Sequence, residues 1–255
     1  VYKRQVSMST LFYLSSAQMD VIRPFFLVQE AFPEGTIKKL SVNYHVLKFG
    51  LRWKDAPKEY GPYKTLYNRF VRWSNMGVFK KIFTALSEST QDTSLLMIDA
   101  TCLKAHRTAA SLRKKGFLSL IGRTKGGLNT KLHVVCDFDG RSIRTLLTAG
   151  TISDYGGAAC LLPTLPSTRI LLADRGYDAG WIRSFLKNRG CTPCIPSRKN
   201  TRVMSIATRN NIPASQDRTH VFPVNDWRHI AMRYDRCAHT FLSAIHLAAI
   251  VIFYL

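Results

Sequence analysis

The stretch Leu95-Leu96-Met97-Ile98-Asp99 decides the fold, together with its counterpart Ile170-Leu171-Leu172-Ala173-Asp174. Each stretch is a short apolar run that ends in an aspartate. A run of this length is too short for a helix and is typical of a buried strand. A carboxylate just past the end of a buried strand lies at the rim of a sheet, where α/β folds usually hold their chemistry. The two runs therefore predict a sheet with Asp99 and Asp174 at its rim.

The residues around these runs predict antiparallel strands first, and then strands that alternate with helices. The expected elements are, in order, strands over residues 130–137 and 141–149, a helix over 155–165, the second Asp-bearing strand and a helix over 179–188. From residue 227 onward the apolar spacing predicts a long helix. This order is typical of an α/β layer with a mixed sheet.

Residues 1–90 are mostly helical in pattern and predict a separate N-terminal domain, with residues 91–255 as the second domain. A stretch of helical spacing precedes a Pro/Gly turn, and a second such stretch follows it. The pair resembles a helix-turn-helix. We expect the second helix to contact DNA, and the alternative is a helical hairpin whose basic face only meets solvent. The predicted DNA contacts on it are Lys64, Asn68, Arg69 and Arg72.

The charge of the chain is strongly positive. Lys and Arg number 37 against 16 Asp and Glu, and the formal net charge is +21 at pH 7. Such an excess predicts a nucleic acid as partner, and the alternative is a solvated basic surface. Arg175 is expected either to neutralise a phosphate beside Asp174 or to make a structural ion pair. Residues 104–131 contain only basic charges, and the predicted DNA contacts there are Lys104, Arg107, Arg123, Lys125 and Lys131.

Several features favour a cytoplasmic protein. Most of the six cysteines lie in apolar stretches, as reduced core thiols do. Residues 1–16 lack the order of a signal peptide. The apolar residues 241–255 are interrupted by His246 and are shorter than the roughly 20 residues of a membrane helix. We therefore expect a buried terminal helix and no membrane partner.

Two carboxylates in a basic chain indicate a divalent-metal site that faces a polyanion. Two-metal phosphoryl transfer uses hard oxygen ligands that hold two Mg²⁺ ions about 4 Å apart. Asp99 and Asp174 are the candidate metal ligands and catalytic residues, although strand-end aspartates also occur without metals. Asp154 precedes an expected helix and is interpreted as a helix cap, and the alternative is that it approaches the metal site.

Several segments resemble bacterial insertion-sequence transposases of the DDE class, and in particular insertion-sequence family five. The segments near the aspartates are Met97-Ile98-Asp99-Ala100-Thr101, Lys104-Ala105-His106-Arg107, Gly122-Arg123-Thr124-Lys125-Gly126-Gly127-Leu128-Asn129-Thr130-Lys131 and Ala173-Asp174-Arg175-Gly176-Tyr177-Asp178. The others are Tyr60-Gly61-Pro62-Tyr63-Lys64-Thr65-Leu66-Tyr67-Asn68-Arg69-Phe70, Asp226-Trp227-Arg228 and Arg233-Tyr234-Asp235-Arg236.

The resemblance implies an RNase H-like core and a protein associated with the bacterial nucleoid. It implies cleavage of transposon inverted ends and their joining to target DNA. The substrate is double-stranded DNA, on which the protein acts as a homodimer or a larger synaptic complex. It implies Mg²⁺ as cofactor, with Mn²⁺ as a substitute. It makes Asp99 and Asp174 the first two catalytic carboxylates, and the third is a glutamate on a helix just before Asp226-Trp227-Arg228.

This chain departs from the family at that third carboxylate, because no glutamate follows Glu88. Pro223 would break a helix there, and Asp217 and Asp226 are the only nearby acids. We therefore expect the fold and DNA affinity of a transposase with weak or absent catalysis. The alternatives are a non-catalytic DNA-binding remnant that represses transposition, and a metal-dependent nuclease without end specificity.

Overall fold

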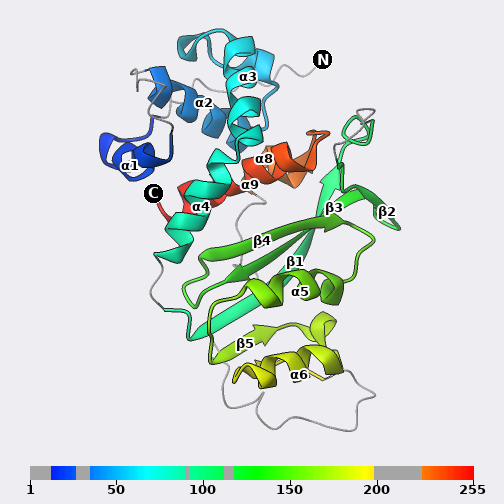
Figure 1. Cartoon of the computed structure of the whole chain (residues 1–255). Helices are drawn as coiled ribbons and strands as arrows, with labels where there is room; N and C mark the ends of the chain where they lie inside the picture. The colour runs from blue at the N-terminus through cyan, green and yellow to red at the C-terminus, as the bar shows by residue number, and fades with distance from the viewer. Residues whose placement is uncertain (1–12, 27–34, 90–91, 112–117, 198–225) are drawn as a thin grey trace.

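The computed structural model describes residues 13–26, 35–89, 92–111, 118–197 and 226–255, and no side chain of residues 35–39. In Figure 1 the N-terminal helices lie at one end of the molecule and the sheet at the other. The first four helices are α1 (Ser16–Ile22), α2 (Gly35–Phe49), α3 (Tyr63–Asn75) and α4 (Val78–Glu88). The later helices are α5 (Asp154–Leu161), α6 (Gly180–Asn188), α8 (Arg228–Ala231) and α9 (Ala238–Phe253).

The described residues form a seven-stranded mixed sheet with β1 at its centre. Strand β1 pairs antiparallel with β3 and parallel with β5, and β5 pairs parallel with β6. Strands β2 and β4 both pair with β3, and β7 pairs with β1. The bounds are β1 (Leu95–Ala105), β2 (Gly122–Thr124), β3 (Gly127–Cys136), β4 (Ser142–Ala149), β5 (Ile170–Ala173), β6 (Thr192–Cys194) and β7 (Met232–Arg233). The predicted α/β architecture with a mixed sheet is confirmed.

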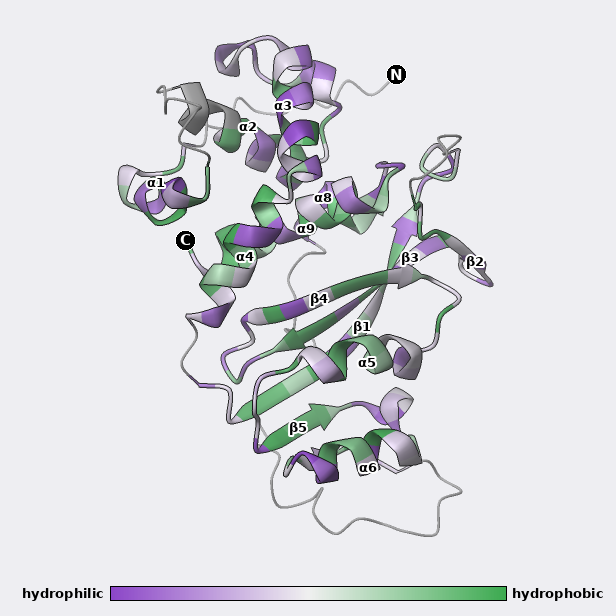
Figure 2. Cartoon of the chain, in the orientation of Figure 1, coloured by the Kyte–Doolittle hydropathy of each residue, from purple (hydrophilic) through white to green (hydrophobic). Residues whose placement is uncertain are grey.

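Helices cover both faces of the sheet. On one face, α4 and α9 pack on β4 and on each other, and Leu103 and Leu132 join their core. On the other face, α5 and α6 pack over Leu96, Val135 and Leu171. Figure 2 shows the corresponding hydrophobic colouring along β1 and β5. The alternating strand residues thus divide between two cores, as the two-residue repeat of a strand requires.

Helix α9 is the buried C-terminal helix that the sequence predicts. Phe241, Ile245 and Ala248 are fully buried on it, and His246 is 3% exposed. Its imidazole ring stacks on Phe83 of α4, with 4.8 Å between the ring centroids. Across the part of the chain that the structure describes, no helix is long and apolar enough to cross a membrane.

The helix predicted from residue 227 onward is interrupted. Helix α8 ends at Ala231, and β7 then pairs with the far end of β1 before α9 begins. Arg233 lies within this break, and its buried guanidinium donates to the carbonyl oxygen of Asp235 in the same segment and to that of the distant Ser119. A pattern of apolar spacing contains no information about such a tertiary contact.

The N-terminal helices share their core with the rest of the chain. Met19, Phe70 and Phe79 belong to the same cluster as Phe241 of α9. Helices α2 and α3 are in contact, but residues 50–62 with two 3-10 turns separate them, which is longer than the tight turn of a helix-turn-helix. The domain boundary at residue 90 stays a prediction.

The cysteines are only partly the core thiols that the sequence suggested. All six are free. Cys136, Cys191 and Cys194 are buried, whereas Cys102 and Cys160 are exposed.

Candidate active site at the end of β5

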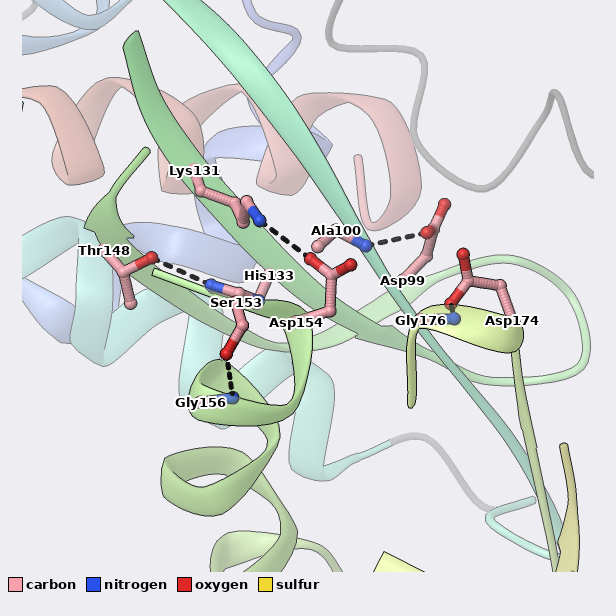
Figure 3. Close-up of polar contacts among 10 residues, drawn as sticks. All are labelled: Asp99, Ala100, Lys131, His133, Thr148, Ser153, Asp154, Gly156, Asp174 and Gly176. Atoms are coloured by element: carbon pink, nitrogen blue, oxygen red, sulfur yellow. Dashed lines mark hydrogen bonds and ion pairs between the residues drawn. The ribbon is translucent and has the colours of Figure 1, made fainter. Parts of the chain in front are cut away.

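The two aspartates that end the apolar runs are brought together by strand register. The parallel ladder of β1 and β5 ends with the pair Ile98 and Ala173, so Asp99 and Asp174 are the next residues on neighbouring strands. Neighbouring strands lie about 4.8 Å apart. Figure 3 shows the two carboxylates on this edge. The register thus makes Asp99 and Asp174 neighbours on adjacent strands, whereas their role as metal ligands stays a prediction.

The position of Asp99 differs from the prediction in one respect. Asp174 does follow the last residue of β5, but β1 continues through Asp99 as far as Ala105. The reason is that β3 pairs with β1 well beyond the end of β5. Asp99 consequently lies inside a long strand, and its backbone is held by a neighbour that short-range sequence patterns do not reveal.

Backbone hydrogen bonds orient both carboxylates. The Ala100 N–H donates to Oδ1 of Asp99 at 2.7 Å, and the Gly176 N–H donates to Oδ1 of Asp174 at 2.9 Å. Asp174 is thereby the N-cap of the 3-10 turn Arg175–Tyr177. Asp99 is half-buried and Asp174 is exposed. The pair is thus fixed in direction while its edge stays open to solvent.

The interpretation of Asp154 as the cap of α5 is wrong. Ser153 is the N-cap of α5, and its Oγ accepts from the Gly156 N–H at 3.3 Å. Asp154 is the first helical residue, and its Oδ1 lies 2.9 Å from Nζ of Lys131 on β3. The order Ser-Asp allows either residue to cap, so the sequence alone does not decide between them.

The predicted DNA contacts on α3 are largely exposed. Lys64, Asn68 and Arg72 are exposed, whereas Arg69 is half-buried with its guanidinium carbon 5.9 Å from the Trp73 ring centroid. The opposite face of α3 packs inward through Leu66 and its buried neighbours. The amphipathic pattern thus separates a core face from a basic face, as predicted.

The other predicted DNA contacts follow the sheet. Lys104 and Arg107 are exposed near the far end of β1, and Arg123 and Lys125 are exposed on the β2 hairpin. Arg175 is exposed directly beside Asp174. Lys131 departs from the prediction, because it is mostly buried and paired with Asp154.

The pKa of Tyr67 on α3 is raised, first by burial of the phenol and second by the negative charge of Asp235. Asp235, in the turn after β7, therefore lies near Tyr67 of α3.

The segment expected to supply the third carboxylate is mostly outside the described residues. Asp217 and Pro223 lie there, and only Asp226 is described, as an exposed residue. Trp227, by contrast, is 1% exposed and stacks edge-on against Tyr44 of α2, with ring centroids 5.1 Å apart. Asp226-Trp227-Arg228 thus anchors α8 on α2 through its tryptophan.

The comparisons with known proteins bear on both halves of the chain. A family model described as "Transposase DDE domain" matches residues 90–250. One described as "Putative transposase of IS4/5 family" matches residues 14–83. The first model alone covers more than half of the sequence. The chain belongs to the DDE transposase family.

Individual relatives agree with this membership. The putative transposase for insertion sequence element IS402 of Burkholderia cepacia is 26% identical over 136 residues, which are 46% of this chain and 63% of that protein. The putative transposase for IS6501 of Brucella ovis is 26% identical over 134 residues, 49% of this chain and 98% of that protein. An uncharacterized protein, y4sN of Sinorhizobium fredii, is 38% identical over 65 residues, 26% of this chain and 51% of that protein.

The match is partial for some of these relatives, since this DDE transposase chain spans about half of y4sN and under two thirds of the IS402 protein. Among solved structures, a piggyBac transposase synaptic complex with hairpin DNA matches with a TM-score of 0.42 and 12% identity, over 78% of this chain and 50% of that one. The mixed sheet flanked by helices, in a DDE transposase family member, has the RNase H-like fold that the sequence predicts.

A buried histidine beside this site makes stability depend on pH. His133 on β3 is fully buried, its Nε2 lies 2.9 Å from Thr148 Oγ1, and burial lowers its pKa from 6.5 to about 4. Nearby Lys131 lowers that pKa further, whereas Asp154 opposes the shift. The unfolded chain therefore binds a proton at a higher pH than the folded chain does. Above pH 6.5 the neutral His133 costs the folded state no protonation energy. As the pH falls from 6.5 toward 4, the free energy of unfolding decreases by at most about 3 kcal/mol.

The variant His133→Gln tests this dependence, because glutamine stays neutral and still reaches Thr148. Its free energy of unfolding, measured by urea denaturation from pH 7 to 4, is expected to fall less steeply than that of the unsubstituted chain. His106→Gln, at a half-buried surface position, is the control. Equal slopes for His133→Gln and the unsubstituted chain would contradict the assignment.

Proposed function

We propose that the chain is a transposase that binds the double-stranded inverted ends of its element and, with Mg²⁺ or with Mn²⁺ as a substitute, cleaves and joins DNA phosphodiesters. The observation that carries this proposal is the register that places Asp99 and Asp174 next to each other at the end of the β1–β5 ladder. Family membership and the net charge of +21 support it.

The donors at this edge fit a hard divalent cation. Carboxylate oxygens are ligands that Mg²⁺ prefers, and it usually keeps several waters besides. In the described part of the chain no group of three potential ligands is already assembled around one point. Asp99 and Asp174 would therefore hold the cation with water and DNA oxygens as its remaining ligands. Such a cation activates the attacking water or hydroxyl and stabilises the leaving oxygen.

The chain's own residues would orient the substrate. In the proposed complex the exposed Arg175 neutralises the phosphate beside Asp174, as charge-assisted contacts of arginine with phosphate do. The basic face of α3 and the exposed residues near the end of β1 bind the flanking duplex through its phosphates. Joining two ends at one target requires two such sites together, so we include a homodimer on DNA in the proposal.

The experiment is strand cleavage of a labelled duplex that carries the inverted end of the encoding element. Weak cleavage in Mg²⁺ or Mn²⁺ is expected for the unsubstituted chain, because the glutamate of the family is missing. Asp99→Ala and Asp174→Ala are expected to abolish it and to abolish Mn²⁺ binding in calorimetry. Asp139→Asn, in the exposed β3–β4 turn, is the matched control and leaves both unchanged. Cleavage at wild-type rate by either alanine variant would refute the proposed site.

A second candidate function is a non-catalytic DNA-binding remnant that represses transposition. The absence of any glutamate after Glu88 favours it. Binding of the same labelled duplex, measured by fluorescence anisotropy at rising salt concentration, distinguishes the two functions. Strong, steeply salt-dependent binding that Asp99→Ala leaves unchanged, with no cleavage at any metal concentration, would decide for the remnant.

A further inference from the structure

A third carboxylate lies beside Asp174, although it comes from a different element. A Cβ added at Gly176 would be 2.7 Å from Oδ2 of Asp154 and 3.0 Å from Oδ1 of Asp174. Both oxygens thus border the same small space, which is open only because residue 176 is glycine. In Figure 3 the Asp154 carboxylate lies between Lys131 and the labelled Gly176. The first turn of α5 therefore delivers an acid to the proposed metal edge.

A buried hydroxyl near these acids has no hydrogen-bond partner. The side chain of Tyr177 is 1% exposed, and among the described residues its Oη has no partner. Burial, followed by the charges of Asp154, Asp99 and Asp174, raises the pKa of this phenol above its usual range. An unsatisfied buried hydroxyl costs about 1–3 kcal/mol. A water bound to a cation held by these carboxylates would satisfy it.

Lys131 supplies a positive charge at Asp154 when the edge holds no cation. Its Nζ lies 2.9 Å from Asp154 Oδ1, and the two side chains are only 14% and 32% exposed. Neighbouring carboxylates repel one another, so a positive charge among them stabilises the arrangement. A divalent cation at the same edge would take over that role.

We propose that Asp154 is the third metal-binding carboxylate of this site, in addition to Asp99 and Asp174. The proposal rests on the function proposed above. It assigns Asp154 to the position of the third carboxylate, which the missing glutamate leaves unfilled. Because the three acids are not assembled around one point, Asp154 exchanges Lys131 for the cation by turning its carboxylate toward Asp174. Lys131 is then released toward the DNA phosphate, which restores the contact predicted for it from the sequence.

Calorimetric titration of the full chain with Mn²⁺ tests this assignment through two variants of opposite effect. Asp154→Asn is expected to weaken Mn²⁺ binding at least tenfold, since it removes one charged ligand. Lys131→Met is expected to tighten binding severalfold, since it removes the competing cation. Asp139→Asn is the matched control with unchanged affinity. A purely structural ion pair would instead give equal losses of thermal stability in Asp154→Asn and Lys131→Met, with Mn²⁺ affinity unchanged in both.

Cleavage of the polypeptide by bound Fe²⁺, with ascorbate and peroxide, provides a second readout that needs no catalytic activity. Radicals formed at the iron are expected to cut the chain near residues 99, 154 and 174, and Asp154→Asn should lose the cut near 154. Unchanged affinity and an unchanged cut pattern in Asp154→Asn, with binding lost in Asp99→Ala, would overturn this inference alone. Absence of Mn²⁺ binding by the unsubstituted chain would overturn the proposed metal site with it.

Discussion

Replacement of Arg233 by methionine is expected to lower the free energy of unfolding by about 3–5 kcal/mol, because it removes a buried hydrogen bond to Thr130 and three partly buried ones to carbonyl oxygens. The Arg233 side chain is fully buried. Its guanidinium donates to the Asp235, Ser119 and Arg236 carbonyl oxygens and to Thr130 Oγ1. It also lies over the Phe241 ring at 4.8 Å. One side chain thus ties β3, the segment before β2 and the start of α9 together.

The matched control is Arg236→Met, since Arg236 is an exposed arginine of the same turn. Its free energy of unfolding is expected to stay within about 0.5 kcal/mol of that of the unsubstituted chain. Denaturation in urea measures both variants. Equal stability of the two variants would show that the buried hydrogen bonds of Arg233 do not hold these segments.

Gly157→Ala is expected to cost about 2–3 kcal/mol of stability through overpacking. A Cβ at this position in α5 would lie 2.2 Å from Cε1 of His133. The imidazole ring cannot easily retreat, because it is buried on β3 and held by Thr148. The helix must therefore shift, and Asp154 in its first turn must move with it. Thermal and urea denaturation measure the loss.

The double variant Gly157→Ala, His133→Ala tests the cause of this loss. Removing the ring makes room for the added methyl group, so the second substitution should cost far less in the Gly157→Ala background than alone. Gly180→Ala is the control, because a Cβ at that helical glycine would meet no atom within 4 Å. Additive effects of the two substitutions, or an equal loss in Gly180→Ala, would contradict the steric explanation.

Local patterns account for most of the fold. The runs that end in Asp99 and Asp174 form strands, and residues 130–137 and 141–149 form strands joined by a turn, as expected. These predictions succeed because a strand buried in a sheet needs an apolar run, and that run is visible in the residues of the strand itself. The prediction of one long helix after residue 227 fails, because β7 interrupts it by pairing with the distant strand β1.

The candidate site was predictable only in part. Asp99 and Asp174 follow from their strands, and the exposed basic residues of α3 follow from its amphipathic spacing. For Asp154 the sequence left a helix cap and an approach to the metal site as alternatives, because its approach to Asp174 depends on the space at Gly176 and on the close packing of Gly157 of α5 against His133. Neither the unpartnered hydroxyl of Tyr177 nor the ion pair of Lys131 leaves a pattern along the chain.

The sequence by itself determined the strands, their order of occurrence, the family and the positive charge, because these depend on the chemistry of neighbouring residues. Only the tertiary structure decided that β1 extends past Asp99, that Arg233 is buried and that Asp154 stands beside Asp174. Each of these depends on contacts between residues far apart in the chain. Their free energy comes from close packing and desolvation, which exist only once the elements have assembled.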